Sequence, residues 1–315
     1  MSDTDRATEI VQQAVKALRD RGVALRASSG ALAQLAATVG SRPAAAGKSS
    51  AATAEPPVPA GDPAKKLTEM FAETVKEPDA RPSAPSPKRT PVTPPPAMEP
   101  SSLAPKIGSK AERLAAMCEP VLACVKCPNL VSSRTQVVFG VGNPEAELMF
   151  VGEAPGADED AAGEPFVGKA GQLLTKIIET MGLKRSDVYI ANVLKCRPDM
   201  PEGSSGNRKP TGPEMNTCKP YLLEQIQIIQ PKVIVGLGAT AMEGLLGVDK
   251  FPITKNRGTW HEFAGIPLMP TFHPAYLLRN QALSEKRRVW EDMLAVLETL
   301  GHPISDKQRS YFLSK

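Results

Sequence analysis

Short apolar runs alternate with stretches of helical spacing over the last two thirds of the chain. Four runs have the length and composition of buried strands, and they lie at 148–151, 188–194, 232–236 and 266–272. Three stretches place apolar residues three and four positions apart, as amphipathic helices do, and they lie at 172–181, 239–246 and 284–300. This alternation predicts an α/β fold in three layers, with a four-stranded parallel sheet between helices.

Local signals sharpen two of the predicted helices. Thr211 and Glu214 have the spacing of a capping box with Pro213 in the first turn, so a helix is expected to begin there. The helix over 284–300 has one apolar face, and the side chains expected to be buried on it are Val289, Trp290, Met293, Leu294, Val296 and Leu297.

The first third of the chain follows a different pattern. Residues 1–40 carry one short apolar stripe, which predicts an amphipathic helix that either lacks a core of its own or docks on a partner. Residues 41–105 hold 15 of the 31 prolines and a single aromatic residue, so we expect a disordered linker that cannot bury enough apolar surface to fold. All other aromatic residues follow position 138. The folded domain is therefore expected over 106–305, with a tail at 306–315.

Charge and composition narrow the class of protein. The formal net charge of +4 and the pI near 8.7 are compatible with nucleic acid binding without demonstrating it. The N-terminus has no apolar signal core, and the chain has no run of about 18 apolar residues that could span a membrane. Five cysteines are few for a disulfide scaffold. We expect a cytosolic protein with reduced thiols, in which clustered cysteines indicate metal binding.

The cysteines are the first candidate site. Cys124 and Cys127 form a CxxC motif, Cys196 follows the second predicted strand, and Cys218 lies in the next predicted helix. Four thiolates can hold either zinc or an iron–sulfur cluster, and the spacing alone does not separate these. The alternative is that Cys196 and Cys218 are small buried residues. Cys118 lies on an amphipathic helix and is expected to be a packed thiol.

Two loops that follow predicted strands form the second candidate site. The stretch 152–174 is rich in glycine and acidic residues, and the stretch 271–279 contains His273. The carboxyl ends of parallel strands meet at one sheet edge, where ligands bind in such folds, although solvated acids and a structural histidine are the alternatives. Leu277 and Leu278 are read as lying on an exposed loop beside Arg279, either as core contacts or as a wedge into base stacking.

Several motifs together resemble one family. The segments GEAPGADED, PFVGKAGQLL, ANVLKCRP and TFHPAYLLRN, at 152–160, 165–174, 191–198 and 271–280, are similar to family 4 uracil-DNA glycosylases, the iron–sulfur branch of the uracil-DNA glycosylase superfamily. The resemblance covers about 112–300. It implies a [4Fe–4S] cluster bound by Cys124, Cys127, Cys196 and Cys218, with Cys118 left free. It also implies hydrolysis of the uracil–deoxyribose bond in DNA after the base is flipped out.

The resemblance assigns a role to each site residue. Phe166 is expected to stack on uracil, Asn192 to bind its Watson–Crick edge, and backbone groups of Glu153 and Ala154 to bind it as well. A neutral His273 is expected to donate a hydrogen bond to the departing uracil anion, and Glu159 to orient His273 or water. The expected DNA contacts are Gly168, Lys169, Gly171, Leu277, which would fill the gap left by the base, and Arg279.

Departures from the wider superfamily leave some points open. Ala154 stands where other branches have a water-activating aspartate, so the base that activates water is unassigned. Gly156 stands where other branches have a tyrosine that excludes thymine. The segment between Cys196 and Cys218 is longer than usual for the family and is expected to form a larger loop near the cluster.

Two alternatives to this function remain at this point. One is a relative that traps its product covalently, but the Arg-Ile-His run of that branch does not occur here. The other is a non-catalytic zinc or iron–sulfur DNA-binding module. The main prediction is a monomeric, cytoplasmic and nucleoid-associated enzyme of base excision repair that acts on single- or double-stranded DNA and could bind a protein partner through residues 1–40.

Overall fold

The computed structural model describes residues 107–200 and 206–313, and the predicted segments 1–40 and 41–105 lie outside these residues. A mixed sheet runs through the described domain in the order β1-β3-β2-β4-β6-β5. Its strands are β1 Val141–Gly142, β2 Leu148–Gly152, β3 Tyr189–Asn192, β4 Val233–Leu237, β5 His261–Phe263 and β6 Ile266–Thr271. The four central strands are parallel, as predicted, and β1 and β5 pair antiparallel at the two edges.

The sheet of the described domain therefore has six strands, whereas four were predicted, and the two additional ones are the edge strands β1 and β5. β1 has two residues and β5 has three, which is too short for an apolar period to be read. β5 and β6 form a hairpin through Ala264 and Gly265, which both have positive φ (51° and 78°), as in the type I′ turns that two-residue hairpins favour.

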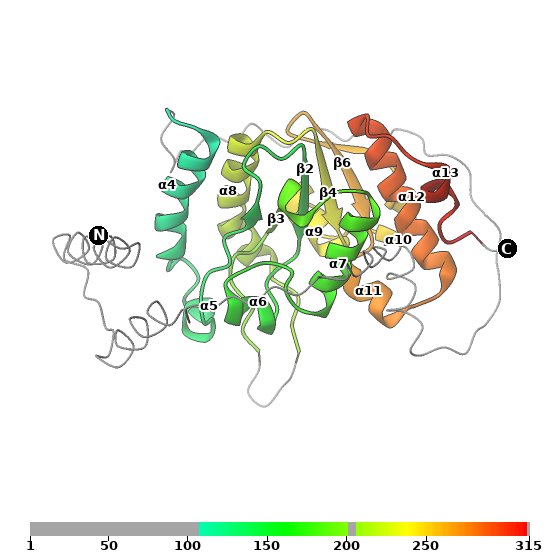
Figure 1. Ribbon diagram of the computed structural model, residues 1–315. Coiled ribbons are helices and arrows are strands. Elements are labelled where there is room, and N and C mark those ends of the chain that lie inside the picture. The colour runs from blue at the N-terminus through cyan, green and yellow to red at the C-terminus, as the bar shows by residue number, and fades with distance from the viewer. Residues whose placement is uncertain (1–106, 201–205, 314–315) are drawn as a thin grey trace, which may run out of the picture. The chain divides into compact units, whose positions relative to one another are not determined.

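Helices cover both faces of the sheet (Figure 1). Their bounds are α4 Lys110–Leu122, α5 Pro128–Ser133, α6 Ala157–Ala162, α7 Lys169–Thr180, α8 Gly212–Ile229, α9 Ala239–Leu246, α10 Ile253–Asn256, α11 Pro274–Arg279, α12 Leu283–Leu300 and α13 Asp306–Ser310, with a 3-10 turn at Arg185–Asp187. The capping box at Thr211 is present at the start of α8, and the predicted apolar face of α12 is buried. Within the described ranges, no helix is both long enough and apolar enough to cross a membrane.

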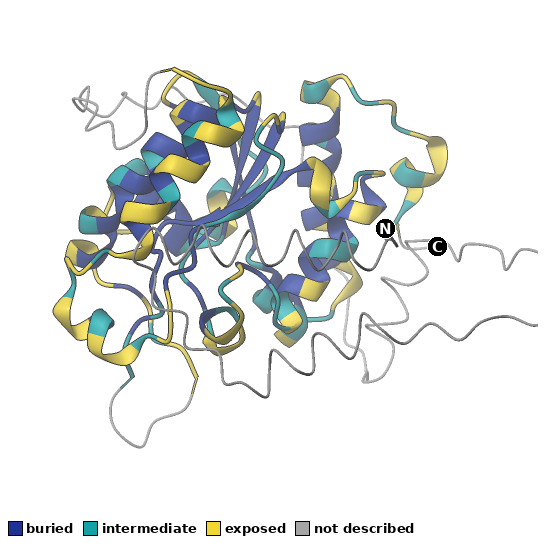
Figure 2. Ribbon diagram, turned by 60° about the vertical axis from the view of Figure 1, so that its left-hand side comes forward, coloured by how far each residue is buried: buried dark blue, intermediate teal, exposed yellow. Residues whose placement is uncertain are grey.

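Successive residues of β2 point into two separate cores, which confirms the three-layer arrangement. Met149 and Val151 belong to the core beneath α4, α8 and α9, whereas Leu148 and Phe150 belong to the core beneath α7 and α12. The central strands β2, β3 and β4 are buried along their whole length, and the outer faces of the helices are exposed (Figure 2). A parallel sheet buried in this way leaves its polar groups at the strand ends, where the candidate site lies.

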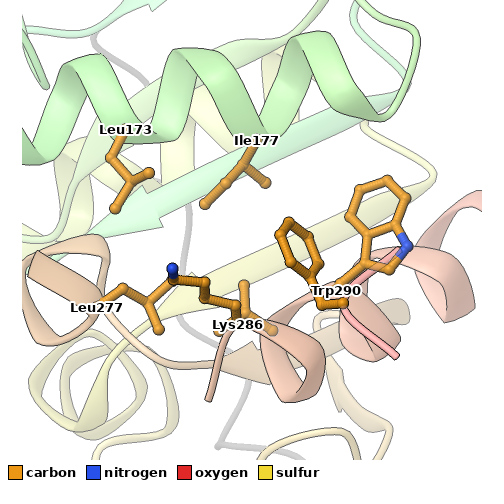
Figure 3. Close-up of a pocket in the computed structure, with 7 residues that line it drawn as sticks. Leu173, Ile177, Leu277, Lys286 and Trp290 are labelled. Atoms are coloured by element: carbon orange, nitrogen blue, oxygen red, sulfur yellow. The ribbon is translucent and has the colours of Figure 1, made fainter. Parts of the chain in front are cut away.

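The predicted tail packs on the domain and extends it beyond residue 305. The Trp290 indole donates a hydrogen bond to the Gln308 carbonyl oxygen at 2.6 Å, and the Gln308 amide donates to the Thr180 carbonyl oxygen at 3.1 Å. Phe312 closes a small cavity of about 10 Å³, which is about the space that one water molecule needs. Leu173 and Ile177 point from α7 into this space, opposite side chains from α11 and α12 (Figure 3).

Candidate active site

Asn192 lies at the carboxyl end of β3 and presents an unsatisfied polar atom. It pairs in register with Gly152 at the end of β2, and it is only 2% exposed. Its Oδ1 atom is buried and has no hydrogen-bond partner among the described residues. A buried acceptor without a partner is destabilising, so this atom is suited to receive a donor from a ligand.

Gly152 allows Asn192 and Phe166 to approach the same point. A Cβ atom at Gly152 would overlap Asn192 Oδ1 and would lie 2.5 Å from Cζ of the Phe166 ring. A glycine at the end of a buried strand is a sequence signal for such a close approach. The amide and the ring therefore border one small space at the sheet edge.

Phe166 is held by an unusual backbone conformation. Its φ is +56°, in the left-handed region that residues other than glycine seldom adopt, and it is 6% exposed. A Cβ atom at Gly171 would overlap the Phe166 carbonyl group, so the first turn of α7 packs directly on this backbone. Gly171 is buried by this contact, and the expectation that it contacts phosphate gives way to a packing role.

Glu159 has partners other than the one predicted. Its carboxylate accepts hydrogen bonds from the backbone N–H groups of Gly156, Val167 and Gly168 at 3.0, 3.0 and 2.9 Å. Its hydrogen bonds in the described structure do not include His273. The carboxylate ties the start of α6 to the segment that follows Phe166, so Glu159 holds the loop that carries the ring. A role in orienting water stays a prediction.

His273 caps α11 immediately after β6. Its Nδ1 atom accepts a hydrogen bond from the Ala275 backbone N–H at 3.1 Å, which assigns the proton of the neutral ring to Nε2. Burial, together with the positive charge of Arg279, lowers the pKa of His273 to about 4. The imidazole is therefore neutral at pH 7 and can donate one hydrogen bond. Its ring centroid lies 5.6 Å from that of Phe166, with 31° between the planes.

The strand before His273 is fixed by the neighbouring turn. Gly238, at φ +90°, donates its backbone N–H to the Thr271 carbonyl oxygen at 2.8 Å. A Cβ atom on Gly238 would lie 3.0 Å from the Cβ of His273, so a side chain there would press on His273 as well as strain the backbone. The Gly-x-Gly that ends β4 was a sequence signal for this close approach, but the sequence reading did not use it.

Glu153 and Ala154 continue from β2 toward the same space. The Glu153 carbonyl oxygen accepts a hydrogen bond from the Leu194 N–H at 3.1 Å, so it is already engaged. Burial raises the pKa of the Glu153 carboxyl, although a hydrogen bond with the Thr240 side chain opposes this. Ala154 is half-buried and packs on the core beneath α8.

The expected DNA contacts divide into exposed and buried residues. Lys169 and Arg279 are exposed, and Gly168 begins α7. A groove of about 270 Å³ lies beside Lys169, and its lining also includes Gly168 and Arg197. Leu277 does not lie on an exposed loop as expected. It is 3% exposed in α11 and lines the core cavity of Figure 3, which favours the core-contact alternative.

The four predicted ligand cysteines come from separate parts of the chain. Cys124 and Cys127 lie between α4 and α5, Cys196 follows β3, and Cys218 lies in α8. All are free thiols. The described residues contain no group of three or more histidine, cysteine, aspartate or glutamate side chains placed to hold a single metal ion.

Hydrogen-bond donors point at three of these sulfur atoms. The Arg134 guanidinium donates to Cys196 Sγ at 2.9 Å, and the Tyr221 hydroxyl donates to Cys124 Sγ at 3.3 Å. The Lys195 backbone N–H donates to Cys218 Sγ at 3.2 Å. Donors of this kind stabilise thiolates, so the donor set fits a centre in which the sulfurs carry negative charge. Sequence reading missed Arg134, because nothing near it in the chain marks its partner 62 residues away.

Burial opposes ionisation of these thiols as long as no metal ion is bound to them. It raises the pKa of Cys127, Cys196 and Cys218, and mutual repulsion between the cysteines adds to each shift. Metal binding would release these protons and link the segments that carry the sulfurs. Cys118 lies outside this group on α4, where it is half-buried, as expected for a packed thiol.

Comparisons with known proteins find uracil-DNA glycosylases. The profile of the "Uracil DNA glycosylase superfamily" matches residues 139–294. A type-4 uracil-DNA glycosylase of Thermotoga maritima is 46% identical over 186 residues, which cover 59% of this chain and 93% of the relative. A type-4 enzyme of Archaeoglobus fulgidus is 42% identical, covering 56% and 88%. A type-5 enzyme of Thermus thermophilus is 27% identical, covering 58% and 94%.

Proposed function

The chain belongs to the uracil-DNA glycosylase superfamily, and from this premise we propose that it hydrolyses the N-glycosidic bond of uracil in DNA and leaves an abasic site. The reaction belongs to base excision repair, and the enzyme is a DNA glycosidase. The observation that carries the proposal is the buried, unpartnered Oδ1 of Asn192 beside the ring of Phe166, which in turn lies beside the neutral imidazole of His273. These three groups match the three needs of the reaction, which are recognition, base stacking and leaving-group stabilisation.

Asn192 is suited to select uracil by hydrogen bonding. Its Oδ1 accepts from the N3–H of uracil, and its Nδ2 donates to O4. Cytosine offers an acceptor at N3 and a donor at its amino group, so it would leave both amide atoms mismatched. A buried site built for one pattern strongly rejects the opposite pattern. Phe166 supplies the apolar face on which the flipped base stacks, and Glu159 keeps that ring in place.

His273 is suited to stabilise the leaving group. The uracil ring takes the electron pair of the breaking C–N bond, so negative charge develops on its oxygens. The Nε2–H of neutral His273 then donates to O2, where the charge increases in the transition state. The side chain of Ala154 cannot act as a base, so water attacks a sugar that already carries much positive charge.

The four cysteines are suited to hold a structural [4Fe–4S] cluster. The donors that point at three of the sulfurs support a centre built from thiolates, and the family 4 motifs favour the cluster over zinc. When bound, the cluster would link the segment between α4 and α5, the segment after β3 and α8. We assign it no part in the chemistry.

DNA binding completes the proposal. Lys169 and Arg279 are exposed cations near the site, and we propose that they contact phosphates of single- or double-stranded DNA. We expect a monomer that acts in the cytoplasm in association with the nucleoid. A partner that binds residues 1–40 remains a prediction, because these residues lie outside the described part of the chain.

One assay tests the function. The protein is incubated with an oligonucleotide that contains one uracil, and the DNA is then cleaved with alkali. Repeated turnover with strand breakage at uracil is expected, with no breakage of matched oligonucleotides that contain thymine or cytosine. A stable protein–DNA adduct would instead support the covalent relative, and DNA binding without breakage would support a non-catalytic module.

A further inference from the structure

A buried ion pair contacts the end of β6, the strand that leads to His273. Asp292 in α12 is 1% exposed at its side chain, and Arg257, which precedes the turn into β5, is 15% exposed. The Arg257 guanidinium donates two hydrogen bonds to the Asp292 carboxylate, one of them from Nε at 3.0 Å, and also donates to the Arg288 carbonyl oxygen at 2.6 Å. Asp292 lies beside the buried apolar residues Val289 and Met293 of α12.

Stability alone does not explain such a pair. Taking two charges out of water costs free energy that their attraction only partly returns, so apolar residues of similar volume commonly serve as well. Burial raises the pKa of Asp292 to about 6 despite the nearby Arg257, which means that the carboxylate form is disfavoured at this position. We therefore expect the buried Asp292 carboxylate to have a role besides stability.

Thr271, which is hydrogen-bonded to Asp292, indicates what this further role is. The Thr271 hydroxyl donates to Asp292 Oδ2 at 2.6 Å, and Thr271 is the last residue of β6, two positions before His273. Its carbonyl oxygen is held on the other side by the Gly238 N–H. The guanidinium of Arg257 also lies 5.9 Å from the ring centre of Phe272. Both residues that precede His273 are therefore restrained by this pair.

We propose that Asp292, Thr271 and Arg257 form a positioning unit that fixes the end of β6 and thereby aims His273 at the leaving group. The unit acts through the backbone of β6 and touches no substrate. This proposal rests on the proposed function. It adds that three residues outside the base-binding space affect the rate at which the N-glycosidic bond is cleaved. A misplacement of a catalytic group by about 1 Å can lower a rate by about 100-fold, so a small loosening is measurable.

Three variants separate positioning from stability. Thr271→Val removes the hydroxyl and keeps the shape, whereas Thr271→Ser keeps the hydroxyl. The double variant Arg257→Met with Asp292→Leu replaces the pair by apolar side chains of similar volume. Leu297→Ala is the matched control, because it creates a cavity on the same helix without removing any member of the unit.

We expect Thr271→Val to lower kcat about tenfold or more with little change in KM, and Thr271→Ser to stay within about twofold of the unmodified protein. The double variant should keep its melting temperature yet lose kcat to a similar extent. Leu297→Ala should lower the melting temperature and leave kcat nearly unchanged.

Side-chain NMR gives a second readout. The chain has three histidines, which makes assignment practical. The imidazole signals of His273 should shift in Thr271→Val and in the double variant, while those of His261 and His302 stay in place. Unchanged His273 signals and unchanged kcat in both variants would overturn the proposal. If the unmodified protein shows no activity on uracil, the proposed function fails, and the His273 signals still decide whether the unit positions that ring.

Discussion

The proposed base site, formed by Gly152, Phe166, Asn192 and His273, and the cysteine region hold their side chains by different means. At the base site, Asn192 and His273 lie at the ends of parallel strands and are positioned by backbone hydrogen bonds and close-packed glycines. In the cysteine region, the four cysteines come from loops and a helix between 124 and 218, and donors such as Arg134 point at sulfur. The first site is preorganised by the sheet, whereas the second depends on what the thiols bind.

This contrast leads to different expectations for mutation. Side chains at the base site can be removed with the fold intact, because the sheet carries them. If a cluster links the chain segments that carry the four cysteines, removing one cysteine is expected to destabilise the fold.

Removing a predicted ligand should have the largest effect. For Cys218→Ala we expect loss of iron and of most soluble, folded protein, because a buried thiol that anchors α8 would be missing. Iron content and visible absorption of the purified protein measure this. Cys118→Ala is the control and should keep both. A colourless unmodified protein with bound zinc would show that the metal is assigned wrongly.

His273→Ala should have the next largest effect and should act on catalysis alone. Removing a donor to a developing anion costs about 10²–10³-fold in kcat, so we expect a loss in this range with DNA binding retained. Single-turnover excision and a binding titration measure the two quantities. His302→Ala removes a histidine that lies after α12 and should remain fully active. Full activity of His273→Ala would remove this residue from the mechanism.

Gly152→Ala tests the base site by filling its space without removing a functional side chain. Its Cβ atom would press on Asn192 Oδ1 and on the Phe166 ring. We expect kcat/KM to fall about 10–100-fold, the equivalent of losing a hydrogen bond to a buried acceptor. Gly182→Ala is the control, because it makes the same glycine-to-alanine change where no atom lies within 4 Å of the added Cβ. The φ of +87° at Gly182 adds some backbone strain in this control. Activity near normal in Gly152→Ala would mean that uracil does not bind in this space.

The smallest expected effect is on the pH dependence of stability. The folded pKa of His273 is about 4, below the usual value of 6.5, so the unfolded chain binds this proton more readily. Stability should therefore fall as the pH drops from about 6.5 to about 4. In His273→Gln the melting temperature should depend less on pH in this window than in the unmodified protein. Equal slopes for the two proteins would show that the pKa of His273 is not depressed.

The sequence predicted the central architecture because it is encoded in long periodic segments. The parallel strands and the buried face of α12 follow from apolar spacing, and the capping box of α8 follows from Thr211 and Glu214. The edge strands β1 and β5 were missed because two or three residues carry no period. The motifs placed Asn192, Phe166 and His273 at one sheet edge, where the structure has them.

Other features depend on contacts that no local pattern encodes. A phenylalanine gives no signal that it will adopt a positive φ, so the packing of Gly171 on Phe166 was read as a phosphate contact. Leu277 was placed on the surface because its helix has only six residues, and its burial depends on α7 and α12. The partners of Glu159 depend on the path of the whole loop.

The carboxylate of Glu159 also affects how this loop can change during evolution. It binds three backbone N–H groups on both sides of the loop, and the two glycines among its partners have little room for a side chain. A Cβ atom at Gly156 would lie 2.7 Å from Glu159 Oε2, and one at Gly168 would lie 2.5 Å from Asp158 Oδ2. Substitutions at positions 156 and 159 should therefore be non-additive, since each one disturbs the same hydrogen bond between the Gly156 N–H and the Glu159 carboxylate.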